Sequence, residues 1–285
     1  MRKEYVIIGG LALSDTLAGA GYFLLGVWSI SVEATEQSEQ LVSSWHCMMT
    51  PHNLLLAFGG PMSALMLVCV SLDRLVSNFA PVTYFKMTSA YAWKLVGVFY
   101  AYGCVSFIFL LFSSYINSAQ ARHSMLCQTT AAVGSFLAKQ YFLCSRILFG
   151  AVSVIVYILT VPFLKRAIKI KPSQAVMTKT AVSRNLKRQR KLTATVGWCV
   201  MFTFVLFVLP NVGKLMVKNL LEPSNRVRYV LAGYASCVQN INAVMNVFMY
   251  ALKLQDMRRG LRAFLLCKTD LTEHPGMVSA KSGRL

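Results

Sequence analysis

The sequence predicts an all-α membrane protein in which six transmembrane helices form a bundle. Hydrophobic residues make up 56% of the chain and charged residues only 14%, which is more apolar surface than a soluble domain can bury. Six apolar stretches reach the length of about 20 residues that a helix needs to cross a bilayer. These predicted spans are residues 6–30, 47–76, 93–115, 138–164, 192–216 and 229–252.

The first stretch, 6–30, is predicted to be a membrane span and not a cleaved signal peptide. It is too long for a signal peptide, it contains Asp15, and no small-residue cleavage pattern follows it. After the last span, segment 253–267 is basic and amphipathic and is predicted to form a short helix beside the membrane. Residues 268–285 are predicted to be a flexible cytoplasmic tail.

The loops predict which side of the membrane each end of the bundle faces. Loop 165–191 is rich in lysine and arginine and has no acidic residue, whereas loop 31–44 has three glutamates and no basic residue. Cytoplasmic loops carry the excess of positive charge, so loop 165–191 is predicted to be cytoplasmic. With six spans, both termini of this chain then lie in the cytoplasm of a multi-pass plasma-membrane protein.

Much of the net charge of +19 comes from the basic residues of loop 165–191 and of the segment after residue 252. No zinc-finger, homeodomain or RNA-binding signature accompanies the basic residues, so the predicted partner is membrane lipid and not nucleic acid. The four histidines are scattered, and the sequence contains neither a His-Glu-x-x-His nor a Gly-x-Ser-x-Gly pattern. We therefore expect no enzyme activity, no metal site and no cofactor.

One acidic residue, Asp15, lies near the middle of the first predicted span. Ionisable groups at membrane depth are costly and usually face the bundle interior, so Asp15 is a candidate functional residue. Its expected hydrogen-bond partners are Asn242 and Asn246 of the last span. Two interpretations remain open, a sodium or proton site and a structural hydrogen-bonded network.

Basic residues in the outer half of the bundle suggest an acidic ligand. Lys139 and Arg146 are seven residues apart and share one face of the fourth span. Lysines near helix ends commonly extend toward lipid headgroups, but Arg146 lies deeper. Polar residues of several spans complete the candidate ligand pocket, which comprises His52, Asn53, Arg146, Asn211 and Gln239.

Three cysteines lie outside the apolar parts of the spans. Cys47 and Cys127 both face the oxidising outer side in the predicted topology, which favours a disulfide between them over two unpaired thiols. Cys267 ends the basic segment after the last span, where reversible palmitoylation is common. A reduced cytosolic thiol is the alternative for Cys267.

Three segments resemble motifs of rhodopsin-like G-protein-coupled receptors. Segment 71–75 (Ser-Leu-Asp-Arg-Leu) resembles the Asp-Arg-Tyr box, with Leu75 in place of the tyrosine. Segment 11–15 (Leu-Ala-Leu-Ser-Asp) is similar to the Leu-Ala-x-x-Asp core of the second helix of that family. Segment 246–250 (Asn-Val-Phe-Met-Tyr) is similar to the Asn-Pro-x-x-Tyr box of the seventh helix, with valine for proline. Such altered boxes resemble those of nematode serpentine chemoreceptors.

The resemblance implies a receptor that couples an extracellular ligand, a small chemosensory molecule or a peptide, to a heterotrimeric G protein. The six spans then correspond to helices two to seven of a seven-helix receptor, with the first transmembrane helix absent from this sequence. Asp73 and Arg74 take the G-protein-coupling role. The activation switch comprises Asp15, Tyr157, Pro210, Asn246 and Tyr250. In the penultimate span, Phe207 and Val208 replace the usual cysteine and tryptophan of the switch.

Two other functions remain possible from the sequence. In a six-span transporter or channel, Asp15, Arg146 and the helix break at 59–61 would line a substrate path. No inverted repeat or filter-like loop supports that function. The other alternative is a truncated receptor product that does not signal.

Overall fold

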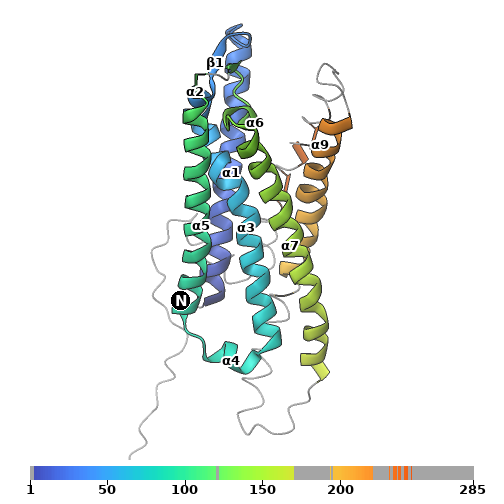
Figure 1. Cartoon of the computed structure of the whole chain (residues 1–285). Coiled ribbons are helices and arrows are strands. Elements are labelled where there is room, and N and C mark those ends of the chain that lie inside the picture. Colours follow the sequence, from blue (N-terminus) through green and yellow to red (C-terminus); the bar gives the residue numbers. More distant parts are fainter. Residues whose placement is uncertain are drawn as a thin grey trace, which may run out of the picture.

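The computed structural model describes residues 3–119, 122–169, 193 and 195–220, together with isolated residues between 231 and 245. Five described helices are long and apolar enough to cross a membrane, which confirms the predicted all-α membrane bundle. They run side by side (Figure 1). Four of these spans are α1 (Lys3–Ala34), α3 (Pro51–Phe79), α5 (Ser89–Ile116) and α7 (Phe136–Lys169). The fifth, Thr195–Val217, includes the π-helix η1 (Phe204–Val208) and overlaps α9 (Leu209–Leu220).

Short elements cover the two ends of the bundle. One end, which we call the cap end, carries strands β1 (Leu41–Ser43) and β2 (Arg122–Ser124) with helices α2 (Ser44–Met49) and α6 (Thr129–Ala132). The strands pair antiparallel, with Val42 opposite His123. The opposite end carries α4 (Pro81–Lys86) and lies near the N-terminus, and we call it the α4 end.

A described apolar helix overlaps each of the first five predicted spans, with bounds that differ by several residues. The second predicted span begins at residue 47, but α3 begins at Pro51 and Cys47 lies in the separate helix α2. Thr50 is extended, and the proline at the first helical position has no N–H to continue the preceding turn. The predicted span 229–252 is described only at isolated residues, and 253–285 lies outside the described residues.

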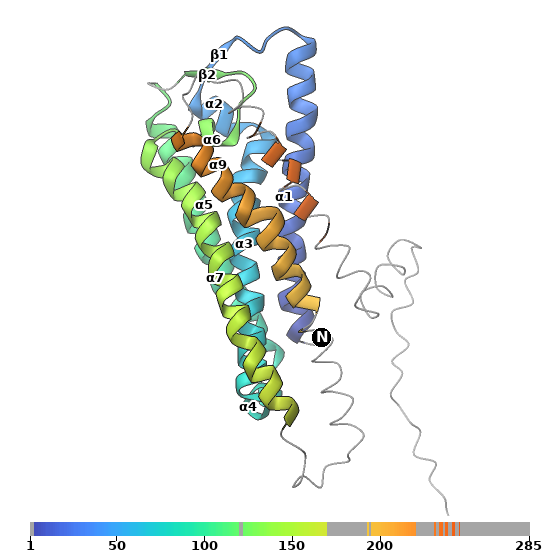
Figure 2. The same cartoon turned by 90° about the vertical axis from the view of Figure 1, so that its right-hand side faces the viewer.

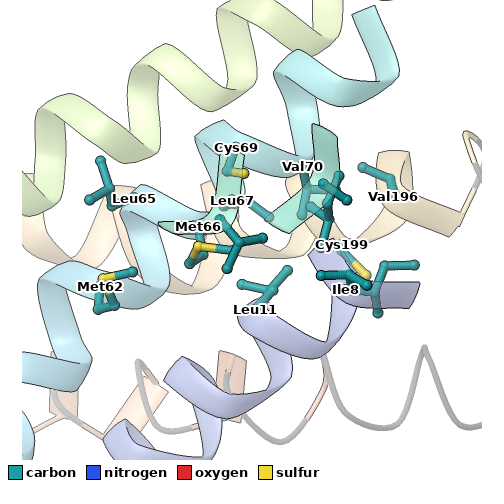
Figure 3. Close-up of a cluster of buried hydrophobic side chains, with 14 of the residues drawn as sticks. Ile8, Leu11, Met62, Leu65, Met66, Leu67, Cys69, Val70, Val196 and Cys199 are labelled. Atoms are coloured by element: carbon teal, nitrogen blue, oxygen red, sulfur yellow. The ribbon is translucent and has the colours of Figure 1, made fainter. Parts of the chain in front are cut away.

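Helix α3 forms the centre of the bundle. The most apolar part of α3 is 72% buried, whereas that of α5 is 11% buried, so α5 lies at the outside of the described bundle. Leu11 of α1 and Met66 of α3 meet in the main core cluster with Cys199 of the fifth span (Figure 3). In the view of Figure 2, α9 lies between α1 and α7.

Helices α1 and α3 approach each other closely at Gly59. A Cβ atom built on Gly59 would lie 2.7 Å from the backbone nitrogen of Ala18, which is closer than such atoms pack. Only glycine fits this contact between the helices. Gly59 therefore serves helix packing, and α3 continues as one helix through Pro61.

The fifth span departs from α-helical geometry next to Pro210. The N–H of Leu209 donates to the carbonyl of Phe204, five residues earlier, which is the π-helical pattern of η1. Asn211 Nδ2 donates to the carbonyl oxygen of Phe207 at 2.8 Å. Proline has no N–H to continue the helical ladder, so this turn is the weakest of the span.

Candidate functional site

An ion pair lies inside the bundle near the α4 end. Arg74 Nε donates to Asp73 Oδ2 at 3.1 Å, and Arg74 Nη2 donates to the same oxygen. Both residues are buried in α3, with Arg74 2% and Asp73 1% exposed. The carboxylate of Asp73 therefore neutralises the guanidinium of Arg74. Burial of the pair keeps the guanidinium away from solvent.

Tyr84 of α4 completes this cluster. Its hydroxyl donates to Asp73 Oδ1 at 3.1 Å and Oδ2 at 3.2 Å, and it accepts from Arg74 Nη2 at 3.3 Å. Burial, aided by the negative charge of Asp73 and opposed by Arg74, raises the pKa of Tyr84 above its usual value. The phenol therefore stays protonated and can donate to the carboxylate.

The motif comparison missed Tyr84 because it is outside the box around Arg74. Pro81 at the first position of α4 starts a helical turn directly after α3 and places Tyr84 one turn later. A tyrosine at this distance after a helix-starting proline, in a loop between two spans, is the signal that could have identified it.

Lys3 links α1 to the same cluster. Its Nζ lies 3.7 Å from the centre of the Tyr84 ring and donates to the carbonyl oxygens of Tyr84 and Met87, the latter at 3.1 Å. A cation at this position is favoured by the ring and by the carbonyls at the end of α4. Lys3 therefore holds the tyrosine that contacts Asp73.

Asp15 lies in the middle of the bundle and is 2% exposed. Its Oδ1 accepts a hydrogen bond from Ser63 of α3, which ties α1 to α3. Asn242, one of its expected partners, accepts a hydrogen bond from Thr203 Oγ1 at 3.1 Å. The other expected partner, Asn246, lies outside the described residues.

Arg146 of α7 points into the half of the bundle nearer the cap end. Its Nη2 donates to the Tyr22 hydroxyl of α1 at 3.2 Å. The guanidinium carbon lies 5.4 Å from the ring centre of Phe142 and 4.8 Å from that of Phe207 in η1. Gly60 of α3 also lies beside this group, since a Cβ there would lie 3.6 Å from the guanidinium carbon, at ordinary van der Waals distance. Arg146 thus contacts three other elements of the bundle.

His52 and Asn53 lie closer to the cap than Arg146 does. Asn53 Nδ2 donates to the carbonyl oxygens of Cys47 and Cys127 at 2.8 and 2.7 Å. His52 Nε2 lies 3.4 Å from the Cys127 carbonyl, and its ring packs against Trp28. These contacts attach the cap to α3 around the Cys47–Cys127 disulfide, which confirms the predicted pairing.

The remaining predicted site residues are distributed along the bundle. Tyr157 of α7 donates to the carbonyl oxygen of Thr193 at 2.8 Å and packs against Gly197. Pro210 and Asn211 lie at the π-helical turn of the fifth span. Four predicted site residues lie outside the described residues: Gln239, Asn246, Tyr250 and Cys267.

Comparison with protein families identifies the family of this chain. The model of the family described as "7 transmembrane receptor (rhodopsin family)" matches residues 2–250. Sequence comparison finds no match among curated proteins. The matched range includes all five described membrane helices, the cluster of Asp73, Arg74 and Tyr84, and Arg146.

Proposed function

Because the chain belongs to the rhodopsin family of seven-transmembrane receptors, we propose that it binds an extracellular ligand and activates a heterotrimeric G protein. The cap end faces the outside of the plasma membrane, and the α4 end faces the cytoplasm. The ligand is a small chemosensory molecule or a peptide. The positive charge of loop 165–191 supports this orientation.

The observation that carries the proposal is the buried cluster of Asp73, Arg74 and Tyr84 at the α4 end. Arg74 is the residue that resembles the arginine of the family box, and here it is neutralised and shielded by two neighbours. This arrangement suits a resting receptor, because the group that would contact a G protein is occupied. Activation then requires Arg74 to separate from this cluster.

The π-helical turn next to Pro210 offers a pivot for that change. Phe207 in this turn contacts Arg146, and the other end of the same span lies beside Tyr157 through Thr193 and Gly197. A ligand that displaces Phe207 would tilt the fifth span at its weakest turn. Ligand binding would shift an existing equilibrium toward the open α4 end, in proportion to its preference for that state.

Nucleotide exchange on a purified heterotrimeric G protein tests the proposal. The chain is reconstituted in lipid vesicles, and the variant Tyr84→Phe is used to weaken the resting cluster without a ligand. We expect Tyr84→Phe to promote exchange and Arg74→Ala, added to it, to abolish that exchange. Lys94→Ala, which removes an exposed cation from the same end of α5, is the matched control.

Two results would contradict the proposed function. Exchange that survives Arg74→Ala would remove the assigned role of Arg74. Solute flux across the vesicles without any G protein, equal in wild type and Arg74→Ala, would favour the transporter function over the receptor function.

A further inference from the structure

Arg146 is a buried cation with an incomplete set of partners. It is 8% exposed, and its Nε has no hydrogen-bond partner among the residues that the structure describes. Its one described hydrogen bond goes to the neutral hydroxyl of Tyr22. A guanidinium offers five N–H donors in a planar fork, so most of its bonding capacity is not used by these contacts.

The position of Arg146 excludes a contact with lipid headgroups. It lies ten residues after Phe136, the first residue of α7, which is about 15 Å along the helix. This depth is about half of the hydrocarbon core. The side chain turns inward to Tyr22, Gly60 and Phe207 of three other elements, so it does not extend along its own helix toward the surface.

A counter-ion for Arg146 is absent from the described part of the chain. The ion pair found there joins Asp73 to Arg74 at the far end of α3. Asp15, in the middle of the bundle, lies seven residues before Tyr22 in α1. Its carboxylate accepts a hydrogen bond from Ser63.

A buried charge without a counter-ion is destabilising. Such an arrangement persists where a ligand supplies the missing charge. A carboxylate matches the planar fork of arginine and can accept two parallel hydrogen bonds from it. The rings of Phe142 and Phe207 form apolar walls beside this group.

We propose that the ligand of this receptor is a small organic anion, a carboxylate with an apolar body, whose carboxylate binds Arg146. The proposal rests on the proposed function, since it names the ligand class for the same receptor site. The apolar body lies against Phe207, which is part of the π-helical turn. Binding at Arg146 is thereby coupled to the pivot next to Pro210.

Thermal unfolding of the full chain in lipid nanodiscs tests the proposal without a G protein. The probes are octanoate and 3-phenylpropanoate, each paired with the alcohol of the same skeleton to correct for partition into lipid. We expect the carboxylates, and not the alcohols, to raise the melting temperature of the wild type. Arg146→Met should weaken carboxylate binding roughly 30-fold or more, because it removes one partner of a buried charge pair.

Two variants separate binding from folding. Without ligand, Arg146→Met should melt at the same temperature as the wild type or higher, because it removes an uncompensated buried charge. Lys139→Met, which removes a cation near the outer end of the same helix, should leave the carboxylate effect unchanged. A large loss of ligand-free stability in Arg146→Met would assign Arg146 a structural role and overturn the proposal.

Three further results would overturn the proposal. The alcohols could raise the melting temperature as much as the carboxylates do, or neither carboxylate could raise it. The effect of the carboxylates could also survive in Arg146→Met. These outcomes are independent of nucleotide exchange. Arg146-dependent binding without exchange would contradict the receptor function alone. Exchange that depends on Arg74, without carboxylate binding, would contradict the ligand class alone.

Discussion

The hydroxyl of Tyr84 in α4 donates hydrogen bonds to both carboxylate oxygens of Asp73 in α3, at 3.1 and 3.2 Å. Asp73 accepts from Arg74 at the same time, so a residue outside the sequence motif fixes the acceptor that neutralises the arginine. Charge-assisted hydrogen bonds of this kind are the strong ones in proteins. These hydrogen bonds therefore stabilise the buried position of Arg74 over an exposed one.

Tyr84→Phe should raise ligand-free nucleotide exchange. The variant keeps the ring and removes the hydroxyl, and a hydrogen bond to a charged group contributes about 1.5–3 kcal/mol, so we expect about a tenfold increase. The measurement is the initial rate of nucleotide exchange in vesicles. Tyr115→Phe, at an exposed tyrosine of the cap end, is the control. An unchanged rate in Tyr84→Phe would show that the hydroxyl does not restrain Arg74.

Lys3→Met should act through Tyr84. Lys3 contacts the Tyr84 ring and the carbonyls at the end of α4, so its loss should free the tyrosine and raise ligand-free exchange in the same direction. The double variant with Tyr84→Phe should increase exchange by less than the two single effects combined, with a coupling of about 0.5 kcal/mol or more. Fully additive effects would separate Lys3 from the cluster.

Gly59→Ala should destabilise the bundle. Its Cβ would lie 2.7 Å from the backbone nitrogen of Ala18, so α1 and α3 must move apart. We expect a loss of about 1–3 kcal/mol in the free energy of unfolding, as for other overpacked positions. Gly19→Ala is a matched control in α1, because nothing lies within 4 Å of the added carbon. Equal melting temperatures for the two variants would contradict the close contact.

Cys127→Ser should lower the stability of the cap. The disulfide closes a loop with a sequence separation of 80, and loss of such a bond costs about 2–4 kcal/mol. Asn53→Leu should also reduce the melting temperature, since both carbonyls of the disulfide residues lose their Asn53 donor. Cys104→Ser, at an exposed free cysteine, should have no effect. A disulfide variant as stable as Cys104→Ser would contradict this role.

Acid should weaken the cap through His123. Burial, and then the charge of Lys139, lower the pKa of His123 below its usual value, so protonation favours the unfolded cap. Above about pH 6.5, His123 is neutral in both states and does not lower the free energy of unfolding of the cap. Below that pH, the unfolded cap binds the proton more readily, so the free energy of unfolding falls. Melting temperatures at neutral and acidic pH should differ less in His123→Gln than in the wild type. His46→Gln, at an exposed histidine of α2, should behave as the wild type does.

Local sequence was sufficient to predict the described membrane helices and the paired cysteines. Apolar length is a property of a continuous segment, and the side of the membrane follows from the charge of the loops. The start of α3 at Pro51 was also encoded locally, but the apolar pattern of 47–76 continues across the break and conceals it. Length and hydropathy predict a span better than they predict its ends.

Tertiary structure alone decided which residues surround these groups. Tyr84 reaches Asp73 because α4 folds back under α3, and Lys3 reaches Tyr84 across a sequence separation of 81. The partners of Arg146 come from α1, α3 and η1, and no spacing within α7 predicts them. Hydrogen bonds and ring contacts depend on distances of a few ångströms between segments that are remote in the chain. Only the packing of the helices sets those distances.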